Sequence, residues 1–108
     1  MGIAMSRAAS GLVRALLARA AGDRHRILLT EVRSTDWQSL TFTGERHELT
    51  LRITGDQSRT AAERMIEGLA EAEFAIAGHI VADIAASLAG SGRNESVSVV
   101  IEALTISE

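Results

Sequence analysis

Two short segments of alternating polarity, 48 residues apart, restrict the fold of this 108-residue chain more than any other feature. In HELTLRITG, the residues Leu49, Leu51 and Ile53 alternate with polar residues. In VSVVIEALT, the corresponding positions hold Val97, Val99 and Ile101. Alternation with period two places successive side chains on opposite faces of a strand. Each segment is therefore predicted to be a strand with one face in the core.

The two halves of the chain also correspond ahead of these strands. A shift of 48 residues places Leu28, Val32 and Leu40 on Ile76, Ile80 and Leu88, and Gly44 on Gly92. A helical apolar pattern precedes each block. Both halves then read helix, strand, glycine-containing turn, strand. The sequence predicts one α+β domain over residues 1–108, with an antiparallel sheet, two helices on one face and the order α-β-β-α-β-β.

The helices are expected at two places. The first begins after Ser6 or Ser10 and ends near Gly22, with its apolar stripe at Leu12, Val13, Leu16, Leu17 and Ala20. The second covers residues 59–72, with Ala62, Met65, Ile66 and Leu69 on its apolar face.

The first hairpin is expected between residues 25 and 54. Its first strand places Leu28, Val32, Leu40 and Phe42 on the core face, and residues 43–46 form the turn.

The segment from Glu73 to Gly92 fits two structures. As a strand it carries Phe74, Ile76, Ile80, Ile84 and Leu88 on one face. As a helix it continues the second helix over about residues 58–89, which gives the order α-β-β-α-β. Gly68 and Gly78 would then lie inside the helix, where each costs about 1 kcal/mol relative to alanine. The strand is the preferred interpretation.

Apolar residues also occur on the opposite face of the predicted sheet. They are Ile27, Leu29, Trp37, Val100, Leu104 and Ile106. A sheet with apolar side chains on both faces needs a second cover, and another copy of the chain is the simplest one. A homodimer is therefore expected.

Composition excludes several kinds of chemistry. The chain has no cysteine, so thiol nucleophiles, disulfides and thiolate metal sites are absent. All eleven basic residues are arginine, which excludes a lysine base or Schiff base. The Arg- and Ala-rich composition indicates a bacterial coding sequence, and the lack of cysteine is compatible with the cytoplasm. No apolar run approaches the roughly 18 residues that cross a bilayer, so a soluble protein without a membrane partner is expected.

Four residues are candidates for a ligand site: Trp37, His47, His79 and Asp83. His47-Glu48 begins like the zinc motif H-E-x-x-H, but Leu51 occupies the position of the second histidine. His79 and Asp83, four residues apart, would share one face of either a helix or a strand. No catalytic residue, metal site or cofactor is predicted, and whether the protein is an enzyme stays uncertain, with the sequence leaning against it.

Charge is unevenly placed along the chain. Residues 1–54 hold eight arginines against five acids, whereas residues 55–108 hold three against nine. The leading hypothesis is a homodimeric interaction or assembly domain without catalysis. One alternative is a small-molecule-binding protein or enzyme with a cleft around His47 and His79. The other is a binder of an anionic partner through the arginine-rich N-terminal half, including Arg7, Arg14 and Arg19. Nucleic acid is an unlikely partner because the chain is acidic and poor in aromatic residues, although Arg24, Arg26 and Arg33 would be its contacts.

Overall fold

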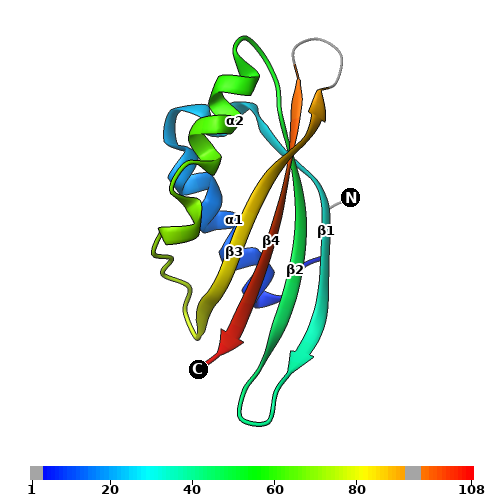
Figure 1. Ribbon diagram of the computed structural model, residues 1–108, viewed down its shortest axis with the longest axis vertical. Helices are drawn as coiled ribbons and strands as arrows, with labels where there is room; N and C mark the ends of the chain where they lie inside the picture. Colours follow the sequence, from blue (N-terminus) through cyan, green and yellow to red (C-terminus); the bar gives the residue numbers. More distant parts are fainter. Residues whose placement is uncertain (1–3, 92–95) are drawn as a thin grey trace.

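The computed structural model describes residues 4–91 and 96–108 as a four-stranded antiparallel sheet with two helices on one side (Figure 1). The elements are α1 (Arg7–Ala20), β1 (Ile27–Gln38), β2 (Thr43–Ile53), α2 (Ser58–Ile66), β3 (His79–Ser91) and β4 (Val97–Ser107). Short 3-10 helices, η1 (Ala21–Arg26) and η2 (Leu69–Glu71), follow the two α-helices. The predicted α+β class and the order α-β-β-α-β-β are confirmed. The glycine predicted to mark the second turn, Gly92, lies outside the described residues.

The two alternating segments lie side by side at the centre of the sheet. The strand order is β1-β2-β4-β3, and Leu49, Leu51 and Ile53 are the cross-strand partners of Ile101, Val99 and Val97. All six side chains are buried, at most 4% exposed, on the face that the helices cover. The core-facing residues of β2 and β4 are therefore as predicted.

The spacing between the two halves differs from the predicted 48 residues. From Arg7 to Ser58, the starts of the helices lie 51 residues apart, whereas β4 begins 54 residues after β2. An even change of six residues leaves the faces of β2 and β4 unaltered, because side chains alternate with period two. The turns are displaced, however, and this part of the predicted repeat is wrong.

The core lies between the sheet and the two helices. Ser6 caps α1, since its hydroxyl accepts a hydrogen bond of 3.1 Å from the amide of Ala9. From α1, Leu12 and Leu16 are fully buried, and Met65 of α2 contributes from the second helix. These are aliphatic and thioether side chains, in keeping with the scarcity of aromatic residues.

The first hairpin differs from its prediction at the edge strand β1. Its turn lies at residues 39–42, not 43–46, so Leu40 is fully exposed and Phe42 is 54% exposed. A bulge between Leu29 and Glu31 shifts the register, so that Leu28 faces away from the helices while Leu29 faces them. One extra residue reverses the faces of everything before it. The predicted core positions of Leu28, Leu40 and Phe42 are wrong, and Ile27 and Leu29 belong to the helix-covered face.

The alternative of one long helix over residues 58–89 is wrong. The second helix, α2, ends at Ile66, and both Gly68 and Gly78 have positive φ angles, +72° and +79°, which glycine adopts without strain. The strand begins only at His79, so Phe74 and Ile76 precede it. A second bulge, between Val81 and Asp83, then moves Ile80 to the uncovered side, where it is 51% exposed.

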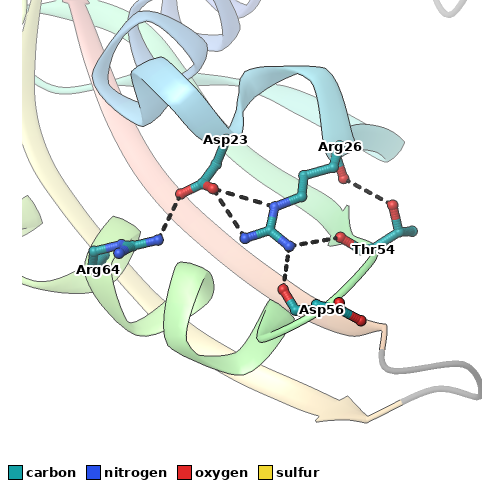
Figure 2. A network of polar contacts seen from close by, with 5 residues as sticks. All are labelled: Asp23, Arg26, Thr54, Asp56 and Arg64. Carbon is teal, nitrogen blue, oxygen red and sulfur yellow. Dashed lines mark hydrogen bonds and ion pairs between the residues drawn. The ribbon is translucent and has the colours of Figure 1, made fainter.

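A polar network joins η1 to the end of β2 and to α2 (Figure 2). The guanidinium of Arg26 donates two hydrogen bonds to one carboxylate oxygen of Asp23 and others to the carbonyls of Thr54 and Asp56. The other carboxylate oxygen of Asp23 accepts a 3.2 Å bond from Arg64. The hydrogen bond from Arg26, followed by the charges of Arg26 and Arg64, holds the pKa of Asp23 below its ordinary value. Arg26 thus ties the chain between α1 and β1 to the chain between β2 and α2.

We expect Arg26→Ala to lower the free energy of unfolding by about 2 kcal/mol, because hydrogen bonds to charged groups are each worth about 1.5–3 kcal/mol when partly buried. Arg24→Ala is the matched control, since Arg24 is exposed and has no hydrogen-bond or ion-pair partner among residues 4–91 and 96–108. Urea titration followed by circular dichroism measures both. Equal stability of the two variants would contradict a stabilising role for the network.

Membrane-crossing potential was assessed from the helices. Within the described ranges, neither helix is long and apolar enough to span a bilayer.

Candidate functional site

The uncovered face of the sheet is the largest surface without a layer of helix over it (Figure 1). Cross-strand pairing defines its four strands: Leu28, Arg33, Thr35 and Trp37 from β1; Arg46, Glu48 and Arg52 from β2; Val100, Glu102, Leu104 and Ile106 from β4; Ile80, Asp83 and Ala85 from β3. The predicted second-face residues Trp37, Val100, Leu104 and Ile106 do lie on this uncovered face.

Charge divides the uncovered face into two halves. The β1–β2 half carries Arg33, Arg46 and Arg52 together with Glu31 and Glu48. Arg33 pairs with both acids, at 3.6 Å and 3.4 Å, in exposed ion pairs that contribute little to stability.

The β3–β4 half carries only acids, Asp83 and Glu102, among the residues described there. Neither has a hydrogen-bond or ion-pair partner within residues 4–91 and 96–108, and the same holds for Arg46. The face therefore presents one half of net positive charge beside one half of negative charge.

Apolar side chains cross one end of the uncovered face in a single row. Trp37 is opposite Gly44, Gly44 is opposite Ile106, and Ile106 is opposite Ile80. Trp37 and Ile106 are half-buried, and Ile80 is half-exposed. This row is the part of the face that gains most from being covered.

A shallow hollow of about 230 Å³ lies in the middle of the uncovered face. Its lining combines both charges, with Arg33, Arg46, Glu48, Asp83 and Glu102, and it includes His47. This volume is smaller than the roughly 300–1,000 Å³ typical of small-molecule pockets. Two of the predicted site residues, His47 and Asp83, thus border one hollow.

The imidazole of His47 points into the helix-covered face and is 3% exposed. Its Nδ1 is 2.7 Å from the hydroxyl of Ser34, and its Nε2 is 2.8 Å from the buried hydroxyl of Thr105. Burial lowers the pKa of His47 below 6.5, and the nearby charge of His79 lowers it further, against the opposing effect of Glu45. With both nitrogens bonded to hydroxyls and the ring shut away from solvent, His47 fits a structural role better than a general base.

His79 and Trp37 meet at the other predicted location. Both line a hollow of about 320 Å³ at the end of the sheet, together with Asp36, Glu45 and Ser107. His79 is fixed there by a 3.1 Å contact between its Nδ1 and the carbonyl of Ala77. Asp83 lies on the opposite face, because the bulge after Val81 separates it from His79. The expectation that His79 and Asp83 share a face is wrong.

Metal binding was examined over the described part of the chain. No group of three histidine or carboxylate side chains there is arranged to hold an ion.

The arginines of the N-terminal half divide into bonded and unbonded groups. Arg19 donates to the carbonyl of Glu67, Arg26 belongs to the network of Figure 2, and Arg33 is paired on the uncovered face. The remaining three, Arg7, Arg14 and Arg24, line a groove of about 640 Å³ beside α1.

Several residues that shape these surfaces were not singled out from the sequence. Arg46 and Glu102 are neighbours only because β2 pairs with β4, a long-range contact. The outward positions in the alternating segments were the available signal, since they hold Glu48 and Glu102 at corresponding polar sites.

Comparison with known proteins finds no match to a family model, a curated protein or a solved structure. Functional inference therefore starts from the geometry of the surfaces described above.

Proposed function

We propose that this protein is a homodimeric assembly domain in which two copies stack their uncovered faces, without catalysis. The observation that carries the proposal is the self-complementarity of this face. Its β1–β2 half bears three arginines and its β3–β4 half bears acids. A face divided in this way attracts a second copy of itself when the halves are exchanged.

A twofold axis parallel to the strands, in the plane between two stacked sheets, performs that exchange. It places β1 and β2 of one copy over β3 and β4 of the other at the same level along the strands. The apolar rows then coincide, with Trp37 of each copy over Ile80 of the other. Arg46 comes near Asp83 of the other copy, which supplies the partner that neither has within its own described chain.

The size of the face is adequate for a stable dimer. Four strands spaced by about 4.8 Å and eleven residues long at about 3.3 Å per residue span about 700 Å². Standard protein interfaces bury about 800 Å² per partner. An aromatic anchor, Trp37, at a rim of charged residues also follows the usual composition of such interfaces.

The alternative of a small-ligand cleft around His47 and His79 has weaker support. His47 is buried with both nitrogens bonded, and the two histidines border different hollows.

Size-exclusion chromatography with light scattering tests the dimer. We expect a mass of twice the 11.5 kDa of one chain for the unaltered protein and of one chain for Ile80→Glu. The substitution removes the apolar cover of Trp37 and adds an acid to a half that already repels acids. Because Ile80 is half-exposed on an edge strand, the variant is expected to keep its fold, which circular dichroism verifies.

Leu40→Glu is the matched control. Leu40 is as large and fully exposed, but it lies in the β1–β2 turn and not on the uncovered face. It should leave the dimer intact. A monomeric unaltered protein at high concentration, or dissociation by Leu40→Glu but not by Ile80→Glu, would refute the proposed interface.

A further inference from the structure

The groove beside α1 is formed by close packing of two segments far apart in the sequence. On one side stands α1, and on the other residues 75–77 run past it. Gly11 makes this approach possible, since a Cβ at that position would lie 2.7 Å from Cγ2 of Ile76. The small side chains of Ala15 and Ala18 leave the groove open along the helix. Its volume of about 640 Å³ is in the range of small-molecule sites.

Every charged side chain that lines this groove is an arginine. Arg7 and Arg14 project from α1, and Arg24 comes from η1. None of the three has a hydrogen-bond or ion-pair partner within the described ranges, 4–91 and 96–108. In contrast, seven acids of residues 55–108 lie on the described chain and none lines the groove. Three unpaired guanidinium groups facing one hollow repel each other unless an anion lies between them.

The spacing of the arginines suits a ligand with more than one anionic group. Arg7 and Arg14 are seven residues apart, which places them two turns apart on one face of the helix, about 10 Å along its axis. Arg24 approaches from beyond the end of α1. Guanidinium groups bind phosphate oxygens through paired N–H donors. The hydroxyl of Ser10 also lines the groove and adds a neutral donor, whereas the hydroxyl of Ser6 is already donated to Glu45.

We propose that this groove binds a small polyphosphate, either free or as the phosphate chain of a nucleotide. Arg7, Arg14 and Arg24 hold the phosphates, and Ser10 adds a hydrogen bond. The groove adjoins the outer side of α1, away from the uncovered face, so the site is independent of the proposed dimer. A polynucleotide is the less suitable occupant, because the chain carries a net charge of −3 and the groove has no aromatic side chain for stacking on bases.

Isothermal titration calorimetry at low salt tests the site with four probes: tripolyphosphate, ATP, adenosine and a single-stranded oligonucleotide. We expect tripolyphosphate and ATP to bind and adenosine not to bind. Equal affinity for tripolyphosphate and ATP indicates a site for phosphates alone, and tighter ATP binding indicates that the groove also contacts the nucleoside. Both results support the proposal.

The variants Arg7→Gln, Arg14→Gln and Arg24→Gln should each weaken binding about tenfold, because each removes charge-assisted hydrogen bonds. Arg59→Gln is the control of equal charge change, since Arg59 is exposed on α2 and outside the groove. It should change the affinity less than about twofold. All four side chains are exposed, so thermal unfolding should be unaltered. Absence of tripolyphosphate binding, equal weakening by Arg59→Gln, binding of adenosine alone, or markedly tighter binding of the oligonucleotide would each overturn the proposal.

Discussion

Replacement of Gly44 by alanine is expected to lower the free energy of unfolding by about 3 kcal/mol, the upper end of the usual cost of overpacking. A Cβ on Gly44 would lie within contact of the main chain of β4, 3.0 Å from the carbonyl carbon of Thr105 and 3.1 Å from Cα of Ile106, and closer still to the Thr105 oxygen. These are backbone atoms at the centre of the sheet. They cannot move aside without breaking the hydrogen bonds between β2 and β4.

Gly22→Ala is the matched control for this experiment. A Cβ on Gly22 would meet no atom within 4 Å, and its φ angle is not in the left-handed region. The control should change stability by less than about 0.5 kcal/mol, as most surface substitutions do. Urea unfolding of both variants decides the matter. If Gly44→Ala proves as stable as Gly22→Ala, the close approach of β2 and β4 at this point is incorrect.

Removal of the buried imidazole of His47 should have a similarly large effect. His47→Ala is expected to cost about 3 kcal/mol, since it leaves a cavity and removes the partner of the fully buried Thr105 hydroxyl. His25→Ala, an exposed histidine on η1, should be nearly neutral by the same measurement. Equal loss in the two variants would mean that the Ser34–His47–Thr105 contacts do not stabilise the fold.

The same histidine predicts how stability depends on pH. Because the pKa of His47 is lowered in the folded state, the unfolded chain binds more protons below its ordinary pKa of 6.5. Protonation then favours unfolding, so the stabilising contribution is complete above pH 6.5 and is lost as the pH falls from 6.5 toward the folded-state pKa. The slope approaches about 1.4 kcal/mol per pH unit for one proton. Urea midpoints of the unaltered protein and of His47→Asn between pH 8 and pH 5 should diverge in this way. A variant that keeps the full pH dependence would assign it to other groups.

The central strands were predictable because period-two alternation is a local property of the chain. Leu51 and Val99 needed only their immediate neighbours to reveal which face they occupy, and burial confirms it. An error of several residues in the predicted spacing of the halves did no harm there, because the true offset of 54 residues differs from 48 by an even number.

The edge strands were not predictable in the same way. Each contains a bulge, near Thr30 in β1 and near Ala82 in β3, and a single extra residue reverses every side chain before it. This is why Leu28 and Ile80 face outward and why His79 is separated from Asp83. Alternation alone does not reveal a bulge when small or polar residues such as Thr30 and Ala82 surround it.

The candidate sites divide along the same line. Sequence alone established the α+β class, the inward faces of β2 and β4, and an excess of unneutralised arginine in the first half, because each follows from residues near one another in the chain. Tertiary structure alone decided that Trp37 and Ile80 share one row, that Arg46 lies beside an acidic half-face, and that Arg7, Arg14 and Arg24 line one groove. These groupings arise from strand pairing and from the packing of α1 against residues 75–77, contacts between segments that the local pattern does not relate.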